Sequence, residues 1–338
     1  MLEYTKYIER TLQLARLGAY YVAPNPMVGA LLVDEKGTVL GEGWHRVYGG
    51  PHAEVECFRD VEKRYPSVDY KRCTLFVSLE PCSHYGKTPP CAKLIIEKGV
   101  GHVVVGTLDP NPKVAGQGVQ MLRAAGIRVE VGVCEDQCRE LNKRFLCLQE
   151  KGRPYVTLKW AQTKDGYLDR LRDEQAKDNR TPLVISTPLT KQIVHKMRAE
   201  NMAILIGSGT ALKDNPRLLT THWPGRNPIR ILLDRRGRVP MNSRIFSDDA
   251  ETIVYRECTD WSFILSDLAT RGIHSVLVEG GAQVLQTIIQ SGVWDEMHIE
   301  ISDTELGESG VPAPAIKLPY VPTTIQDNHY MYEIKNQH

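Results

Sequence analysis

Apolar residues in the first half of the chain follow two spacings, one typical of helices and one of strands. Between residues 3 and 20 they recur every three or four positions, which predicts an opening amphipathic helix. Two apolar runs at 27–34 and 38–45, with a short Glu-Lys-Gly segment between them, predict a β-hairpin. The two kinds of element then alternate, with helices predicted at 53–65, 90–99 and 118–127 and strands at 73–82, 100–110 and 128–133.

The second half repeats this alternation after a break in the pattern. Charged residues, glycine and proline gather at 148–154, between a helical segment and the apolar strand predicted at 155–162. Strands that lead into helices indicate an α/β fold. We therefore predict two α/β domains, residues 1–148 and 149–338, with a solvated polar loop at 170–182 in the second.

Composition and charge describe an ordinary globular protein. Hydrophobic residues make up 42% of the chain and charged residues 25%, and the formal net charge is +1, which gives no indication of a nucleic-acid partner. The N-terminus carries charges throughout, unlike a signal peptide, and no apolar run is long enough to span a membrane. We expect a cytoplasmic protein with no membrane partner, whose eight cysteines are thiols or metal ligands rather than disulfides.

Four residues of the first half have the order of a zinc-dependent active site. His52 and Glu54 stand at the start of a predicted helix, whereas Cys82 follows Pro81 at the end of a strand and Cys91 begins the next helix. Two thiolates and an imidazole hold zinc and leave a fourth position for water, whose pKa zinc lowers to roughly 7. The positive end of a helix favours the thiolate form of cysteine. Glu54 is then placed to move protons without binding the metal, as in zinc deaminases of nucleobases.

Simpler interpretations of these residues stay open at this stage. The histidine can be satisfied within the core, with the cysteines as core fillers. Alternatively the zinc is structural, with His84 as a fourth protein ligand two residues past Cys82, in a non-catalytic zinc-stabilised binding module. Cys134 and Cys138 are four apart and would share a helix face, but no further histidine or cysteine completes a second site there.

Four sequence blocks of the first half resemble one family in particular. They are APNPMVGALLV (23–33), GEGWHRVYGGPHAEVEC (41–57), LEPCSHYGKTPPC (79–91) and DPNPKVAGQG (109–118). Eight residues separate Cys82 from Cys91, in place of the short Cys-x-x-Cys pair of other zinc deaminases. In these blocks the chain resembles the bifunctional riboflavin-biosynthesis deaminase–reductases. The resemblance implies an N-terminal cytidine-deaminase-like three-layer domain with a mixed sheet.

The same resemblance implies the first reaction and the residues that perform it. The reaction is zinc-hydroxide hydrolytic deamination of 2,5-diamino-6-ribosylamino-4(3H)-pyrimidinone 5′-phosphate, with Glu54 passing the proton of the water to the ring and to the leaving amine. Substrate contacts are expected from Asn25, His45, His84 and Lys87, of which Lys87 suits the phosphate as a mobile cation.

Glycine-rich turns follow two apolar strands of the second half, in GSGTALKDNP (207–216) and VEGGAQVLQ (278–286). Glycines there let backbone N–H groups approach a phosphate at a helix N-terminus, although neither turn is the GxGxxG dinucleotide fingerprint. Together with PYVTLKWAQTKDG (154–166), these turns resemble the reductase half of the same family, which is dihydrofolate-reductase-like. The resemblance implies NADPH, which reduces the ribosyl chain of the deaminated product to ribityl.

The resemblance also implies contacts for this half and a homo-oligomeric assembly. NADPH needs cations at its 2′-phosphate, and the three arginines after a predicted strand are candidates. The residues expected to contact the cofactor are Ala161, Thr210, Asp214, Gly281, Ala282, Gln283, Val284 and Leu285, and those expected to contact the substrate are Lys159, Arg198, Leu218 and Glu279. The candidates for the 2′-phosphate are Arg235, Arg236 and Arg238.

The second half departs from the family pattern in three places. The polar segment 167–186 replaces a compact Ser-x-x-Trp-Ile segment, and Thr221 stands where an arginine is often found. Residues 300–317 replace an expected apolar strand and glycine-rich loop. The departures leave open that the reductase half is degenerate and only the deaminase acts. A cytidine or tRNA adenosine deaminase with an unrelated tail is the other enzyme alternative.

Overall fold

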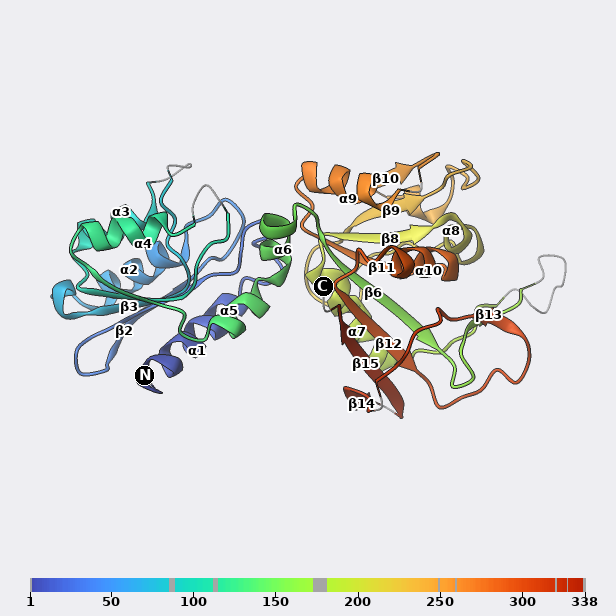
Figure 1. Ribbon diagram of the computed structural model, residues 1–338, viewed down its shortest axis with the longest axis horizontal. Coiled ribbons are helices and arrows are strands. Elements are labelled where there is room, and N and C mark those ends of the chain that lie inside the picture. Colours follow the sequence, from blue (N-terminus) through green and yellow to red (C-terminus); the bar gives the residue numbers. More distant parts are fainter. Residues whose placement is uncertain are drawn as a thin grey trace. The chain divides into compact units, whose positions relative to one another are not determined.

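The structure is a computed structural model that describes residues 2–84, 89–111, 115–172, 181–248, 250–258, 260–319, 321–326 and 328–336. The chain folds into two compact units, residues 1–152 and 153–338. Both combine one main sheet with helices on its two faces (Figure 1). No helix in the described part of the chain has the length and apolar character that a bilayer crossing needs.

A five-stranded mixed sheet forms the centre of the first unit, in the order β2-β1-β3-β4-β5. The predicted hairpin is present as an antiparallel pair, β1 with β2, and β1 also pairs antiparallel with β3. The three strands β3, β4 and β5 run parallel. The strands span Gly29–Val33 (β1), Val39–Trp44 (β2), Thr74–Leu79 (β3), His102–Thr107 (β4) and Arg128–Val131 (β5).

Helices cover both faces of this sheet and complete the expected three layers (Figure 1). One buried apolar cluster joins the sheet to α2, α3 and α4, and a second joins its other face to α1 and α5. The helices are α1 (Leu2–Arg16), α2 (Ala53–Arg64), α3 (Cys91–Lys98), α4 (Gln117–Ala124), α5 (Glu135–Leu141) and α6 (Lys143–Lys151), with a short 3-10 turn η1 (Tyr70–Arg72).

The helix α2 lies directly against β2 because a glycine faces it there. A Cβ atom on Gly43 would overlap the backbone of Ala53 and Cys57. Burial of Phe58 and Val61, at most 2% exposed, fixes the rotation of the helix on the sheet. The first turn of α2, which carries Glu54, is therefore held rigidly at one end of the sheet.

An eight-stranded sheet forms the second unit, in the order β10-β9-β8-β11-β6-β12-β15-β14. The first six strands in this order, β10, β9, β8, β11, β6 and β12, run parallel to one another. The strand β15 pairs antiparallel with β12 and with β14. A separate pair joins β7 to β13. The strands are β6 (Tyr155–Gln162), β7 (Tyr167–Arg170), β8 (Ala203–Gly207), β9 (Ile229–Leu233), β10 (Thr252–Tyr255), β11 (Ser275–Gly280), β12 (Glu296–Ile301), β13 (Gly310–Pro312), β14 (Thr324–Gln326) and β15 (His329–Lys335).

The two faces of this sheet differ in polarity. On one face an apolar cluster joins β6, β11 and β12 to α9 (Trp261–Thr270) and α10 (Ala282–Ser291). The other face packs on α8 (Ser208–Asp214) through a smaller apolar cluster, and α7 (Pro188–Glu200) reaches polar side chains of β11 and β12. A short 3-10 turn, η3 (Arg244–Phe246), lies within the α8 cluster. Residues that alternate along one strand therefore belong to different environments.

Two sequence expectations differ from the structure in their details. A boundary after residue 148 would cut α6, because that helix continues to Lys151 and ends at Gly152, which adopts a left-handed conformation (φ 65°). Residues 300–317, where the family pattern has an apolar strand, begin at the end of β12. Met297 and Ile299 of β12 are buried in the apolar cluster, whereas Glu300 is buried on the opposite face of the sheet. Most of the predicted polar loop at 170–182 lies outside the described residues.

Candidate active sites

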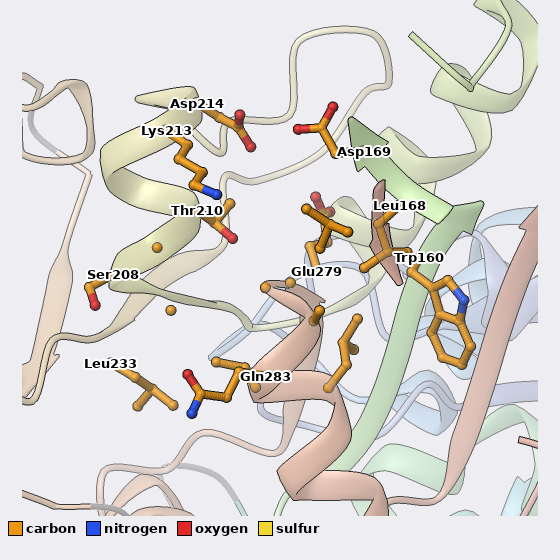
Figure 2. A pocket seen from close by; sticks show the side chains of 18 of the residues that line it. Trp160, Leu168, Asp169, Ser208, Thr210, Lys213, Asp214, Leu233, Glu279 and Gln283 are labelled. Atoms are coloured by element: carbon orange, nitrogen blue, oxygen red, sulfur yellow. The ribbon is translucent and has the colours of Figure 1, made fainter. Parts of the chain in front are cut away.

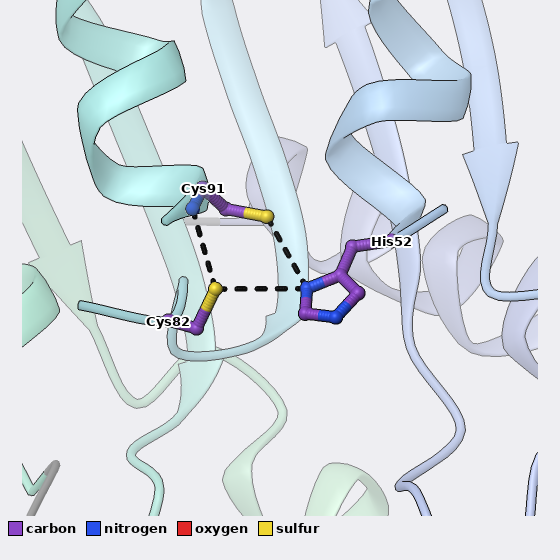
Figure 3. A group of neighbouring side chains, drawn as sticks. All are labelled: His52, Cys82 and Cys91. Carbon is purple, nitrogen blue, oxygen red and sulfur yellow. Dashed lines mark hydrogen bonds between the residues drawn. The ribbon is translucent and has the colours of Figure 1, made fainter. Parts of the chain in front are cut away.

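Three residues of the first unit form a compact group of metal-ligand atoms (Figure 3). The Nδ1 atom of His52 lies 3.6 Å from Cys82 Sγ and 3.4 Å from Cys91 Sγ. Zinc bonds of about 2.1 Å to nitrogen and 2.3 Å to sulfur at tetrahedral angles place these atoms about 3.6 Å apart. Two thiols and one imidazole at this spacing therefore fit a tetrahedral zinc with one further position.

Helix ends hold this group in place. His52 is the residue that precedes α2, and Cys91 is the first residue of α3. Cys82 lies in the loop after β3, but the backbone N–H of Cys91 donates to its Sγ at 3.2 Å. The N-terminus of α3 thus acts on both sulfurs, and its partial positive charge stabilises thiolate.

The electrostatics of the group agree with a charged ligand set. Hydrogen bonds from Cys91 and His52 lower the pKa of the Cys82 thiol to about 4 despite its burial. The hydrogen bond to Cys82 in turn raises the pKa of His52 to about 9. Both shifts describe the group without an ion, and they have one cause: a thiolate that the surrounding donors stabilise.

Glu54 lies beside the group without belonging to it. Its side chain is buried, with 3% exposed, and forms a hydrogen bond with Cys91. Burial raises the pKa of this carboxyl, and the nearby Cys82 thiolate raises it further. Glu54 is absent from the set of converging ligand atoms. The structure therefore brings a non-ligating carboxylate next to the metal-ligand group.

Asn25 and His45 meet next to His52. The Asn25 amide lies 3.1 Å from Nε2 of His45, and Nδ1 of His45 lies 2.9 Å from the carbonyl of Pro51. The His45 and His52 rings are in edge contact, with centroids 5.6 Å apart. Asn142 holds the Asn25 turn by bonding both backbone groups of Met27 at 2.8 and 2.9 Å. No motif points to Asn142, which lies 115 positions from Met27 in the chain.

The remaining two predicted substrate contacts are His84 and Lys87. His84 is exposed, and among the described residues the converging ligand group contains only the one histidine and two cysteines named above. A fourth ligand from His84 is therefore excluded in this arrangement. His84 does lie near Asp109, whose carboxyl pKa it lowers against the dominant effect of burial. Lys87 lies outside the described residues.

Glu80 organises the loops around this site and was missed in the sequence. Its buried carboxylate accepts backbone N–H groups from Asp109 at 3.2 Å, Gly116 at 2.9 Å and Val119 at 3.1 Å. A Cβ atom on Gly118 would overlap the carbonyl of Pro81, so the two segments pack backbone to backbone. Because Pro81 precedes Cys82, Glu80 connects the motif at 109–118 directly to the metal-ligand loop.

The second unit contains a cavity of about 780 Å³ at the carboxyl ends of its parallel strands (Figure 2). That volume suits a cofactor together with a small substrate. Gly281 adopts a positive φ of 82° immediately before α10, which turns the chain around the cavity wall. Of the predicted contacts, Lys159, Ala161, Thr210, Asp214, Glu279, Gly281, Ala282, Gln283, Val284 and Leu285 line it, as do Arg235, Arg236 and Arg238.

Arg198 and Leu218 are not among the residues that line the cavity. Arg198 forms a two-pronged ion pair with Glu279, at 2.7 and 2.6 Å, and also donates to the Leu219 carbonyl at 3.1 Å. Leu218 is 4% exposed and packs in the apolar cluster under α8. Arg198 therefore reaches the cavity through Glu279.

Similar proteins agree with this division into two units. Residues 2–107 match the family model of the cytidine and deoxycytidylate deaminase zinc-binding region, and residues 154–326 match the RibD C-terminal domain. The riboflavin biosynthesis protein RibD of Aquifex aeolicus is 37% identical over 324 residues, which covers 89% of this chain and 87% of that protein.

Two solved structures have the same architecture over nearly the whole chain. A diaminohydroxyphosphoribosylaminopyrimidine deaminase/5-amino-6-(5-phosphoribosylamino)uracil reductase from Thermotoga maritima has a TM-score of 0.87 and 36% identity, with 99% of each chain covered. Acinetobacter baumannii RibD has a TM-score of 0.86 and 31% identity, with 98% of each chain covered.

Fold and site together define a zinc-binding deaminase region joined to a reductase-like α/β domain. The chain belongs to the RibD family of riboflavin biosynthesis proteins. The family predicted from the sequence motifs and the predicted fold class are thereby confirmed. A cytidine or tRNA adenosine deaminase with an unrelated tail is wrong, because the second half matches the RibD C-terminal domain.

Replacement of Glu80 by alanine should loosen the first unit. Three backbone N–H groups would lose a charged acceptor, and hydrogen bonds to charged groups contribute about 1.5–3 kcal/mol each. We expect the free energy of unfolding of this unit, measured by urea titration, to fall by about 3 kcal/mol or more. Glu97→Ala is the control, since its exposed ion pair with Lys93 contributes no more than about 1 kcal/mol. Equal stability of the two variants would contradict this role of Glu80.

Proposed function

We propose that this chain performs two consecutive steps of riboflavin biosynthesis, one in each unit. The first is zinc-dependent deamination of 2,5-diamino-6-ribosylamino-4(3H)-pyrimidinone 5′-phosphate, and the second is NADPH-dependent reduction of its ribosyl group to ribityl. One observation carries the proposal: a three-ligand zinc group with a buried carboxylate beside it lies in a chain whose other half has a cofactor-sized cavity.

In the deaminase site the zinc ligands would be His52, Cys82 and Cys91. Zinc held there would lower the pKa of a water molecule and so supply a nucleophile at neutral pH. Glu54 is buried within reach of the same group, so it would accept the proton of that water and deliver it to the ring nitrogen and to the leaving amine. Asn25 and His45, fixed by one another, would orient the pyrimidine ring.

In the reductase site the cofactor would lie along the wall formed by Thr210, Asp214 and the turn 281–285. NADPH held there would supply the hydride that reduces C1′ of the ribosyl group, with oxidation to NADP⁺. The bond between C1′ and the ring oxygen breaks in this step, and the oxygen takes up a proton. Lys159, an ammonium group on the cavity wall, would donate that proton, while Glu279 would hold ribose hydroxyl groups.

Three arginines favour NADPH over NADH in this cavity. Arg235, Arg236 and Arg238 follow β9 and line the same wall as Ser208, to which Arg238 Nη2 donates at 3.3 Å. Arginine binds phosphate through several N–H donors at once. We propose that this cluster binds the 2′-phosphate of the cofactor.

Several expectations stay predictions. Homo-oligomeric assembly, a cytoplasmic location and the absence of nucleic-acid and membrane partners rest on the sequence and on family resemblance. The alternative that the reductase half is degenerate also stays open, and the experiment on Lys159 below addresses it.

Glu54→Gln should abolish deamination without loss of the metal. An amide cannot carry the proton, and general acid–base catalysis contributes about 10²–10⁴-fold to rate. The measurement is ammonia release from the pyrimidine phosphate, together with zinc content by metal analysis. Glu56→Gln, two residues along α2 and paired with Arg46 and Arg59, is the matched control and should retain activity. Loss of zinc from Glu54→Gln, or no ammonia from the unmutated protein, would refute the deaminase assignment.

Lys159→Ala should depress reduction by about 10²–10⁴-fold because it removes the proton donor. Oxidation of NADPH on addition of the deaminated product measures this, and ammonia release in the same preparation should be unchanged. Lys164→Ala, at an exposed position beyond the end of β6, is the control. No NADPH oxidation by an unmutated protein that deaminates would favour the degenerate-domain alternative, and equal loss of both activities in Lys159→Ala would argue against two separate sites.

Arg238→Ala should raise the KM for NADPH by about tenfold, which corresponds to about 1.4 kcal/mol of lost binding. The KM for NADH should stay the same, because NADH lacks the 2′-phosphate. Steady-state kinetics with each cofactor give the comparison. Parallel changes for both cofactors would assign Arg238 to general packing of the cavity wall instead.

A further inference from the structure

Glu300 is a fully buried carboxylate next to the cavity of the second unit. Glu300, on β12, is 0% exposed, at the start of the segment whose sequence departs from the apolar family pattern. Its Oε2 accepts a hydrogen bond from Ser186 Oγ at 2.6 Å, and its Oε1 lies 2.7 Å from Nδ1 of His329. Thr190 in the first turn of α7 forms a further hydrogen bond with this side chain. The carboxylate thus has three hydrogen-bond partners, each on a different segment of the chain.

The remaining neighbour of Glu300 is Lys159. The ammonium nitrogen lies 3.8 Å from Glu300 Oε2. The two residues share a face of the sheet, because Glu300 pairs in register with Ala161, two positions beyond Lys159 on β6. Lys159 lines the cavity and its side chain is only 13% exposed. Glu300 therefore lies on the buried side of a lysine whose other side faces the cavity.

Charges around Lys159 are balanced in pairs. Glu279 on β11 and Arg198 on α7 are bound to one another by two hydrogen bonds. His298, the register partner of Lys159 on β12, bonds Glu296 instead. Glu300, which is bonded to His329 of β15, forms an ion pair with Lys159 at 3.8 Å.

We propose that Glu300, fixed by Ser186 and His329, is a positioning residue of the reductase site that keeps Lys159 protonated and directed into the cavity. This inference rests on the proposed reductase function. Glu300 would then take part in the chemistry of the cavity, and its departure from the apolar family pattern would not indicate a degenerate reductase half.

Physical chemistry gives the reason for such a residue. Burial lowers the pKa of Lys159, and so does the nearby Arg198, whereas Glu300 and Glu279 raise it. A lysine that donates a proton must be charged at working pH, so a buried one needs a fixed counter-charge. Buried ion pairs seldom stabilise a fold more than apolar residues of the same size would. A gain in stability alone is therefore a weak explanation for Glu300.

The test compares two buried glutamates on the same face of the same strand. Glu300→Gln removes the charge next to Lys159. Glu296→Gln, at a site 3% exposed and hydrogen-bonded by Tyr155 and His298, removes a buried carboxylate that does not contact the cavity. Both variants are assayed for NADPH oxidation across pH, for ammonia release and for stability in urea.

For Glu300→Gln we expect kcat of NADPH oxidation to fall about tenfold or more at neutral pH. The alkaline limb of its pH profile should move to lower pH by about 1–3 units, because loss of an opposite charge lowers the pKa of the lysine. The KM for NADPH and the rate of ammonia release should not change. Glu296→Gln should leave the pH profile in place even where it lowers stability. An unmoved alkaline limb in Glu300→Gln, or the same shift in both variants, would overturn the proposal.

A second measurement does not depend on activity. The pKa of Lys159 can be followed by NMR of protein labelled with ¹³C at lysine Cε, with Lys159→Arg to assign the signal. It should fall in Glu300→Gln and stay constant in Glu296→Gln. A constant pKa in Glu300→Gln refutes the positioning role. A fall in pKa in a protein that never oxidises NADPH refutes the reductase function while leaving the electrostatic role of Glu300 intact.

Discussion

Both sites depend on charges that are taken out of water and stabilised by fixed partners. In the first unit the partners are the N-terminus of α3 and an imidazole, which favour a thiolate on Cys82. In the second they are pairs of opposite side chains, Arg198 with Glu279 and Lys159 with Glu300. Buried charge is costly unless it is paired. The sheets and helices serve to hold these partners at bonding distance, and the chemistry follows from that placement.

The fold and the metal-ligand group could be predicted largely from the sequence. Hydrophobic periodicity is local, so strands such as β6 and helices such as α2 can be predicted without knowledge of contacts between distant residues. His52, Cys82 and Cys91 were found because zinc chemistry restricts both residue type and position relative to helix ends. The end of the first domain was placed less well, because a charged helix that continues to Lys151 resembles a linker in composition.

Residues that act through distant contacts had no such signal. Asn142 holds Met27 across 115 positions of the chain, and Glu80 binds backbone groups of another loop. Glu300 begins the segment that departs from the family pattern, and its partners Ser186 and His329 are brought to it only by the three-dimensional arrangement. Periodicity and motif spacing report on neighbours in sequence, whereas these roles are defined by neighbours in space.

The attachment of Glu80 has a consequence for the metal-free protein. One side chain ties the strand end that leads to Cys82 to three amides of the segment from Asp109 to Val119. Ligand binding and local order in such an arrangement are thermodynamically linked. Loss of the ion would therefore speed amide exchange at Asp109, Gly116 and Val119, so zinc would stabilise these distant contacts as well as take part in the reaction.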